Sequence, residues 1–118
     1  MGTHTAATAS ERITAEVTAW PGVRAEYGTR GEFAFKLGGR ELGHLHGDHI
    51  AHFGFPKHVW TELHEQQRID YHPVFPGRPG FGAREIESDA DVDDVIALMR
   101  LNYDRVVDRH GLPAEAAA

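Results

Sequence analysis

The chain has 118 residues, 41% hydrophobic and 25% charged, which is the balance of one ordinary globular domain. Its net charge of -6 argues against a nucleic-acid partner held through phosphate contacts, and the absence of cysteine excludes disulfides and thiolate chemistry. No apolar run approaches the roughly twenty residues of a membrane span, and the first residues carry no secretory signal. We therefore expect a cytoplasmic protein with no nucleic-acid and no membrane partner; the sequence does not indicate an oligomeric state.

The first predicted element is a short helix. Ser10 is its candidate N-cap, and Ile13, Val17 and Trp20 follow at spacings of four and three residues. This spacing is typical of one face of an amphipathic helix. Pro21 is expected to end it, because a residue before proline resists the helical conformation.

Four short strands joined by tight turns are expected next. Apolar and polar residues alternate in "VRAEY", which starts at Val23, and "EFAFKL" places Phe33, Phe35 and Leu37 on one face. "LGGR" is a hairpin turn into "RELGHLH", and "GD" separates that strand from "HIAHFGF". The pattern predicts an antiparallel meander.

A second helix is expected after Pro56, with Val59, Trp60 and Leu63 as its inner stripe. "YHPVFPGRPG" is too rich in proline and glycine for a central strand, so we interpret residues 71–80 as a loop. "FGAREIE" then offers a fifth strand.

The last helix has the strongest pattern in the chain. Ser88 or Asp89 is its predicted N-cap, and Gly111 and Pro113 are expected to end it. Its acidic residues lie at the start and its basic residues near the end, as the helix dipole prefers. The apolar residues that recur at helical spacing are Val92, Val95, Ile96, Met99, Tyr103, Val106 and Val107.

The element order α-β-β-β-β-α-β-α predicts the α+β class, a curved antiparallel sheet with helices packed on it. We expect a disordered leader over residues 1–9, a single domain over 10–111 and a disordered tail over 112–118. The first and last helices should pack together or on the same face. The residues predicted to be buried are Phe33, Phe35, Leu45, Leu63, Val95, Ile96 and Met99.

Histidines are the unusual feature of the sequence, since five of nine fall between Gly39 and Trp60. Alternate strand residues share a face, so Leu42, His44 and His46 are predicted to point the same way. His49 and His52 fall on alternate faces of the next strand, and if the third and fourth strands pair, some of these histidines lie opposite His44 and His46. Neighbouring imidazoles disfavour one another's protonation, so the cluster should be mostly neutral near neutral pH.

Three interpretations of these histidines remain open. Exposed sheet positions can simply tolerate histidine. Alternatively, His44 and His46 hold a metal ion, with His72, Asp48 or Glu41 as a third ligand.

The interpretation that we favour is a metal-free cavity, lined by at least two of His44, His46, His52 and His72, that binds or deprotonates a small acidic organic ligand. We expect no tightly bound metal. Asp48 is the expected partner that orients an imidazole. The residues predicted to contact the ligand are Arg40, Glu41, Asp48, His49, His52 and Phe53.

The segment "RELGHLHGDHIAHFGFPKHVW", followed by "IDYHPVFPG", resembles the luciferase-domain family of small bacterial proteins and fungal luciferases. Members of that family look alike in a segment E-[LI]-G-H-x-H, then an Asp and a further His, a helix and a distal His-Pro. The similarity extends from about Trp20 to the final helix. The matching positions are Glu41, Leu42, Gly43, His44, His46, Asp48, His52, His72 and Pro73.

The resemblance implies an activity. The fungal members oxidise a hydroxylated pyrone luciferin with molecular oxygen, without an added metal or flavin. A cofactor-independent oxygenase acting on a small aromatic or enolic ligand is therefore expected, with His44 and His46 as base and orienter and His72 in contact with the ligand or the developing oxyanion. The alternative is a module that holds such a ligand, or a partner protein, and performs no chemistry.

Overall fold

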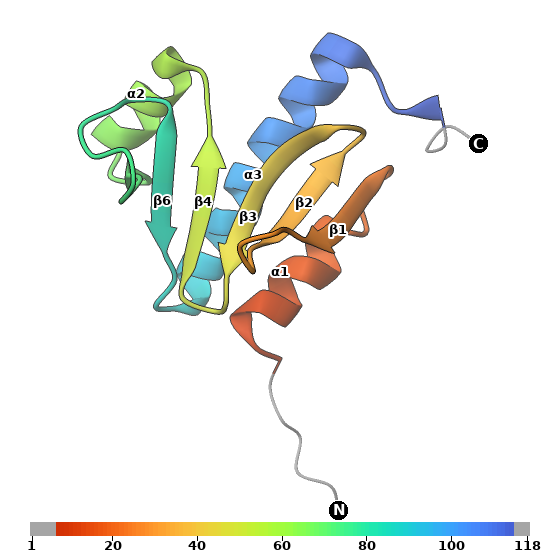
Figure 1. The fold of residues 1–118 in the computed structure, drawn as a ribbon, viewed down its shortest axis with the longest axis horizontal. Helices are drawn as coiled ribbons and strands as arrows, with labels where there is room; N and C mark the ends of the chain where they lie inside the picture. The colour runs from red at the N-terminus through yellow and green to blue at the C-terminus, as the bar shows by residue number, and fades with distance from the viewer. Residues whose placement is uncertain (1–6, 115–118) are drawn as a thin grey trace, which may run out of the picture.

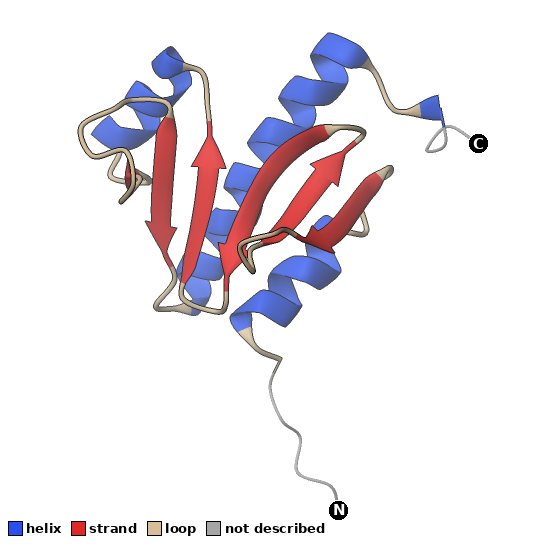
Figure 2. Cartoon of the chain, in the orientation of Figure 1, coloured by secondary structure: helices blue, strands red, loops and turns tan. Residues whose placement is uncertain are grey.

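The structure, a computed structural model, describes residues 7–114 and confirms the α+β class (Figure 1). Within these residues three helices and six strands follow the predicted order, with a two-residue strand, β5, added before the last predicted strand. Figure 2 shows the strands side by side in red and the helices in blue. The elements are α1 (Ala9–Val17), β1 (Val23–Tyr27), β2 (Phe33–Leu37), β3 (Arg40–His46), β4 (Ile50–Gly54), α2 (Lys57–Glu65), β5 (Asp70–Tyr71), β6 (Phe81–Glu85) and α3 (Asp89–His110).

The strands form one antiparallel sheet in the order β1-β2-β3-β4-β6-β5, so the predicted meander is extended by β6 on its β4 side. Tyr71 pairs with Gly82, so the predicted loop begins one residue late, at His72. The first and last helices pack together as expected. Arg12 Nη1 donates to Asp89 Oδ1 at 2.8 Å, and α3 passes behind the sheet in the view of Figure 1.

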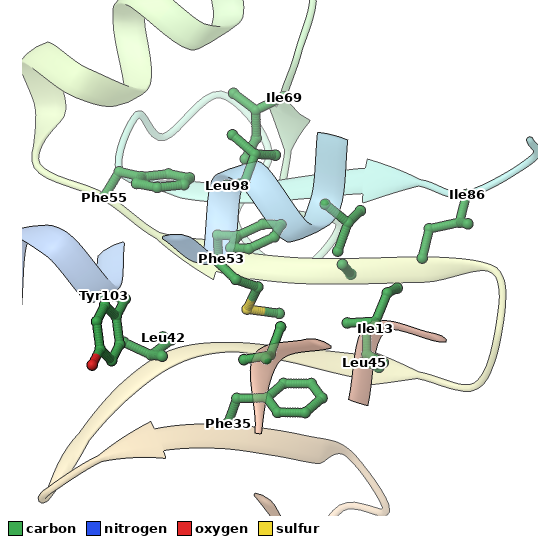
Figure 3. Close-up of a cluster of buried hydrophobic side chains, with 14 of the residues drawn as sticks. Ile13, Phe35, Leu42, Leu45, Phe53, Phe55, Ile69, Ile86, Leu98 and Tyr103 are labelled. Carbon is green, nitrogen blue, oxygen red and sulfur yellow. The ribbon is translucent and has the colours of Figure 1, made fainter. Parts of the chain in front are cut away.

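The hydrophobic core lies between the sheet and helices α1 and α3 (Figure 3). Alternation along the strands directs Phe35, Leu45 and Phe53 into it, where they meet Ile13 and Met99 from the helices. Burial of such side chains is the main stabilising term of the fold. The predicted burial is confirmed for Phe35, Leu45, Leu63, Val95 and Met99, whereas Phe33 and Ile96 are only partly buried at the edge of the core.

A β-bulge interrupts this alternation in β3. The register of β2 against β3 shifts between Phe35 and Lys36, which leaves Leu42 as an extra residue. Leu42 is fully buried in the core, and Asn102 Nδ2 of α3 donates to its carbonyl oxygen at 3.0 Å. The prediction that Leu42 shares a face with His44 was wrong, because the bulge changes which side each residue faces.

The start and end of α1 also differ from the prediction. Thr8 is the N-cap: its hydroxyl accepts from the Glu11 amide at 3.1 Å, and Glu11 Oε1 accepts from the Thr8 amide at 2.8 Å. This reciprocal capping box satisfies two helix-end amides, so the helix starts ahead of the predicted cap, Ser10. Because α1 ends at Val17, Trp20 lies beyond the helix rather than in it.

At the other end of the chain, Ser88 caps α3, which is one of the two predicted positions. The predicted leader 1–9 and tail 112–118 lie largely outside the described residues, and the described end of the leader belongs to α1 and its cap. Across residues 7–114, no helix is both long and apolar enough to cross a membrane.

Candidate functional site

A group of imidazoles lies on the face of the sheet opposite the core. His44 and His46 alternate along β3, and His52 of β4 pairs directly with His44. Leu45 and Ala51, which pair with each other between them, are buried on the core side. Because strand neighbours point to opposite faces, the three histidines share the face that α1 and α3 do not cover.

The loop after β5 brings a fourth imidazole, His72, to the same place. We call His44, His46, His52 and His72 the histidine cluster. Its ring centroids are 5.0 Å apart for His44 and His46, 5.2 Å for His44 and His52, 4.7 Å for His46 and His52, and 4.1 Å for His52 and His72. The predicted gathering of these side chains on one face is thus present in the structure.

Glu41 determines the proton position on His44. Its Oε2 lies 2.9 Å from His44 Nδ1, and an ionised carboxylate can only accept, so Nδ1 carries the proton. This tautomer places the lone pair of the neutral His44 ring on Nε2. Residues three apart in a regular strand point to opposite faces, and the bulge at Leu42 is what allows Glu41 to reach the histidine side.

His52 is the buried member of the cluster, with 8% of its surface exposed. Neither of its ring nitrogens has a hydrogen-bond partner among residues 7–114. Burial, followed by the neighbouring His72, His44 and His46, lowers the pKa of His52 to about 4. The ring is therefore neutral near neutral pH and keeps one lone pair available for a ligand.

His72 has the opposite tautomer to His44. The backbone amide of Val74 donates to His72 Nδ1 at 3.1 Å, so the neutral ring carries its proton on Nε2. Burial, followed by the nearby His44 and His46, lowers the pKa of His72 and favours this neutral form. The cluster therefore presents a proton acceptor on His44 and a hydrogen-bond donor on His72.

Aromatic rings border the cluster on the loop side. Phe75 lies 5.5 Å from His72 and stacks on Phe81 at 4.5 Å, measured between ring centroids. Phe81 is 42% exposed, so the pair offers a flat apolar surface to a planar ligand. The sequence interpretation did not single out these two rings, of which Phe75 lies within the proline- and glycine-rich loop and Phe81 directly after it.

The predicted cavity over the cluster is not shown. His46 is exposed and His44 partly exposed, so the cluster lies on an open face. A hollow of about 870 Å³ nearby is lined by other residues, among them His64, Tyr71 and Arg84. A closed pocket lined by the cluster stays a prediction.

Asp48 and His49 lie apart from the cluster, in the turn between β3 and β4. Asp48 Oδ1 accepts from the Ser10 amide at 2.9 Å, at the start of α1, and His49 lines a separate hollow there. The carboxylate that orients an imidazole is therefore Glu41, not Asp48 as expected.

Two further predicted ligand contacts are also placed elsewhere. Arg40 lies at the far end of β3, where its Nη2 is 3.4 Å from His110 Nδ1. Phe53 is 3% exposed and belongs to the core on the other side of the sheet. Of the predicted site residues, the structure thus brings together Glu41 and the histidine cluster.

Comparison with protein families gives one match. The Luciferase domain model matches residues 39–102, more than half of the chain, a range that includes Glu41 and the histidine cluster. No curated protein and no solved structure matches the chain with significance.

Proposed function

The chain belongs to the Luciferase domain family, and on that premise we propose that it is a luciferase-like oxygenase. It would act on a small enolic, hydroxypyrone-type molecule with molecular oxygen and without a metal or flavin. The observation that carries the proposal is the His44 ring, whose Nδ1 is held by Glu41 at 2.9 Å and whose Nε2 is free to accept a proton. The resemblance to fungal luciferases supports the substrate class.

The reaction starts with transfer of the enol proton to His44 Nε2. The Glu41 carboxylate stabilises the resulting imidazolium. The enolate is electron-rich, so its carbon forms a bond with oxygen, and the O₂ unit is reduced to the peroxide level. Return of the proton from His44 to the peroxide balances the step and yields a hydroperoxide. The protein supplies a base and a binding surface, and the substrate supplies the electrons.

Other members of the cluster have supporting roles in this proposal. The Nε2–H of His72 would donate to the enolate oxygen, where negative charge develops. His46 and His52 pack edge-on against His44, with interplanar angles of 85° and 82°, and hold the base in position. A planar substrate would stack on Phe75 and Phe81.

A second function is favoured by one observation, the exposure of His46 on an open sheet face. Catalysis of this kind benefits from exclusion of water, whereas binding alone does not require it. The alternative is therefore a module that holds a small aromatic or enolic ligand, or a partner protein, on the same face without chemistry.

Oxygen consumption and light emission, recorded together on untagged protein with a hydroxypyrone in air, separate the two functions. We expect oxygen uptake that falls about 10²–10⁴-fold in His44→Ala, because the general base is lost. The matched control is His58→Ala, an exposed histidine on α2, which should keep the wild-type rate. A ligand-induced rise in melting temperature without oxygen uptake indicates the binding module. If the protein shows no oxygen uptake and no ligand-induced rise in melting temperature, both functions are contradicted.

A further inference from the structure

We propose that His44, His46 and His52 form a site for one divalent transition-metal ion of the zinc, cobalt and nickel class. The inference goes beyond the proposed oxygenase and is independent of it, because it requires only these three imidazoles. The ligand nitrogens of the three residues all lie within 4.8 Å of one another. Two neighbouring strands hold them, with His44 and His52 directly opposite in the register.

Small side-chain rotations complete the geometry. Zinc–nitrogen bonds of about 2.0–2.1 Å place the nitrogens of a tetrahedral site roughly 3.3 Å apart. His46 is exposed and His44 partly exposed, so both rings have room to turn toward an ion. The backbone already brings His44 and His52 together, since directly opposite strand residues have Cβ atoms about 4.5–5.5 Å apart.

His52 provides an independent indication of a ligand. Its side chain is 8% exposed, and its two ring nitrogens have no partner within residues 7–114. Its ring centroid lies 5.2 Å from that of His44 and 4.7 Å from that of His46, edge to face in both pairs. Buried polar groups in folded proteins are nearly always paired, and an unpaired one calls for an explanation. A metal ion between the three rings supplies a partner for one of these two nitrogens, the one that carries the lone pair.

The hydrogen bonds around the cluster select which histidines can be ligands. Glu41 holds the proton of His44 on Nδ1, which leaves Nε2 free; a carboxylate behind a ligating histidine is the usual arrangement in metal sites. His72 is excluded, because its Nδ1 accepts from Val74 and its Nε2 carries the proton. The site thus has three protein ligands, and its fourth position faces the open side for water or a small anion.

The ligand set also determines the kind of ion. Imidazole nitrogens suit divalent first-row transition metals such as zinc, cobalt and nickel, whereas calcium and magnesium require oxygen ligands. One consequence concerns the proposed base: a single lone pair on His44 Nε2 cannot hold an ion and accept a proton at once. The ion and the enol therefore compete for the cluster.

The test is a titration of untagged, chelator-dialysed protein with Co²⁺, followed by its visible absorption bands, and with Zn²⁺ by calorimetry. We expect one ion per chain. Glu41→Gln should weaken binding by about 10–100-fold, as for other carboxylates behind ligating histidines. His46→Ala, which removes an exposed ligand, and His52→Gln should weaken it further, while His58→Ala keeps the wild-type affinity. Melting temperatures establish that each variant is folded.

Absence of saturable Co²⁺ binding in the wild type overturns the proposal, as does an equal affinity in His46→Ala and His58→Ala. The two proposals fail separately. A protein that consumes oxygen but binds no ion keeps the oxygenase and loses the metal site, and a protein that binds the ion without oxygen uptake does the reverse. Oxygen uptake that requires the ion contradicts the competition between ion and enol.

Discussion

One face of the sheet is packed against α1 and α3 and lined by apolar side chains, while the other, among the described residues, carries the histidine cluster and its carboxylate. The same strands build both faces: Leu45 of β3 belongs to the core, and its neighbours His44 and His46 belong to the cluster. Strand alternation thus separates stability from chemistry within single elements. Substitutions on the two faces should therefore have separable effects.

The largest expected effect is on the core face. Phe35 is fully buried, so Phe35→Ala should lower the free energy of unfolding by about 3–5 kcal/mol. His46→Ala on the open face should change it by no more than about 0.5 kcal/mol. Urea denaturation measures both. Similar losses in the two variants would show that the faces do not differ as described.

An intermediate effect is expected where β3 meets α3. A Cβ atom added at Gly43 would lie 2.8 Å from Phe53 Cδ1 and 2.9 Å from Met99 Cε. Gly43→Ala should therefore destabilise the protein by about 1–3 kcal/mol through overpacking. Gly54→Ala is the matched control, because a Cβ there meets nothing within 4 Å. If urea midpoints of the two variants agree, the close packing at Gly43 is not as the structure shows.

A third effect should come from pH. His52 has a folded-state pKa of about 4 against an ordinary 6.5, so between these values the unfolded chain binds a proton that the folded chain does not. The part of the free energy of unfolding that comes from the neutral His52 is fully present above about pH 6.5 and is lost as the pH falls toward 4. Urea midpoints should decline less with falling pH in His52→Gln than in the wild type or His58→Ala. An identical decline in all three would contradict the lowered pKa.

Much of this fold follows from periodicity in the sequence. Alternation correctly separated Phe35 and Leu45 from the histidines, and helical spacing with Ser88 identified α3. The two-residue β5 was missed because it runs directly into a loop rich in proline and glycine, and so short a strand has no alternation of its own.

The site was predictable only in part. The clustering of His44, His46 and His52 follows from strand pairing, but the role of Glu41 depends on the bulge at Leu42. A bulge arises from the fit of one strand to its neighbour and to α3, where Asn102 binds the Leu42 carbonyl. No local pattern encodes that fit. The assumption of a regular strand placed Glu41 on the face opposite His44, so Asp48 was expected to orient an imidazole instead.

The most direct test of both proposals is to determine which nitrogen of each imidazole is protonated. This measurement needs neither a substrate nor a metal ion. Proton–nitrogen correlation spectra of histidine-labelled, metal-free protein, assigned with His44→Gln and His72→Gln, report which ring nitrogen carries the proton. We predict that His44 is protonated on Nδ1, toward Glu41, and His72 on Nε2, because its Nδ1 accepts from the Val74 amide. A proton on Nε2 of His44 would remove the lone pair that both proposals require, and would contradict this account.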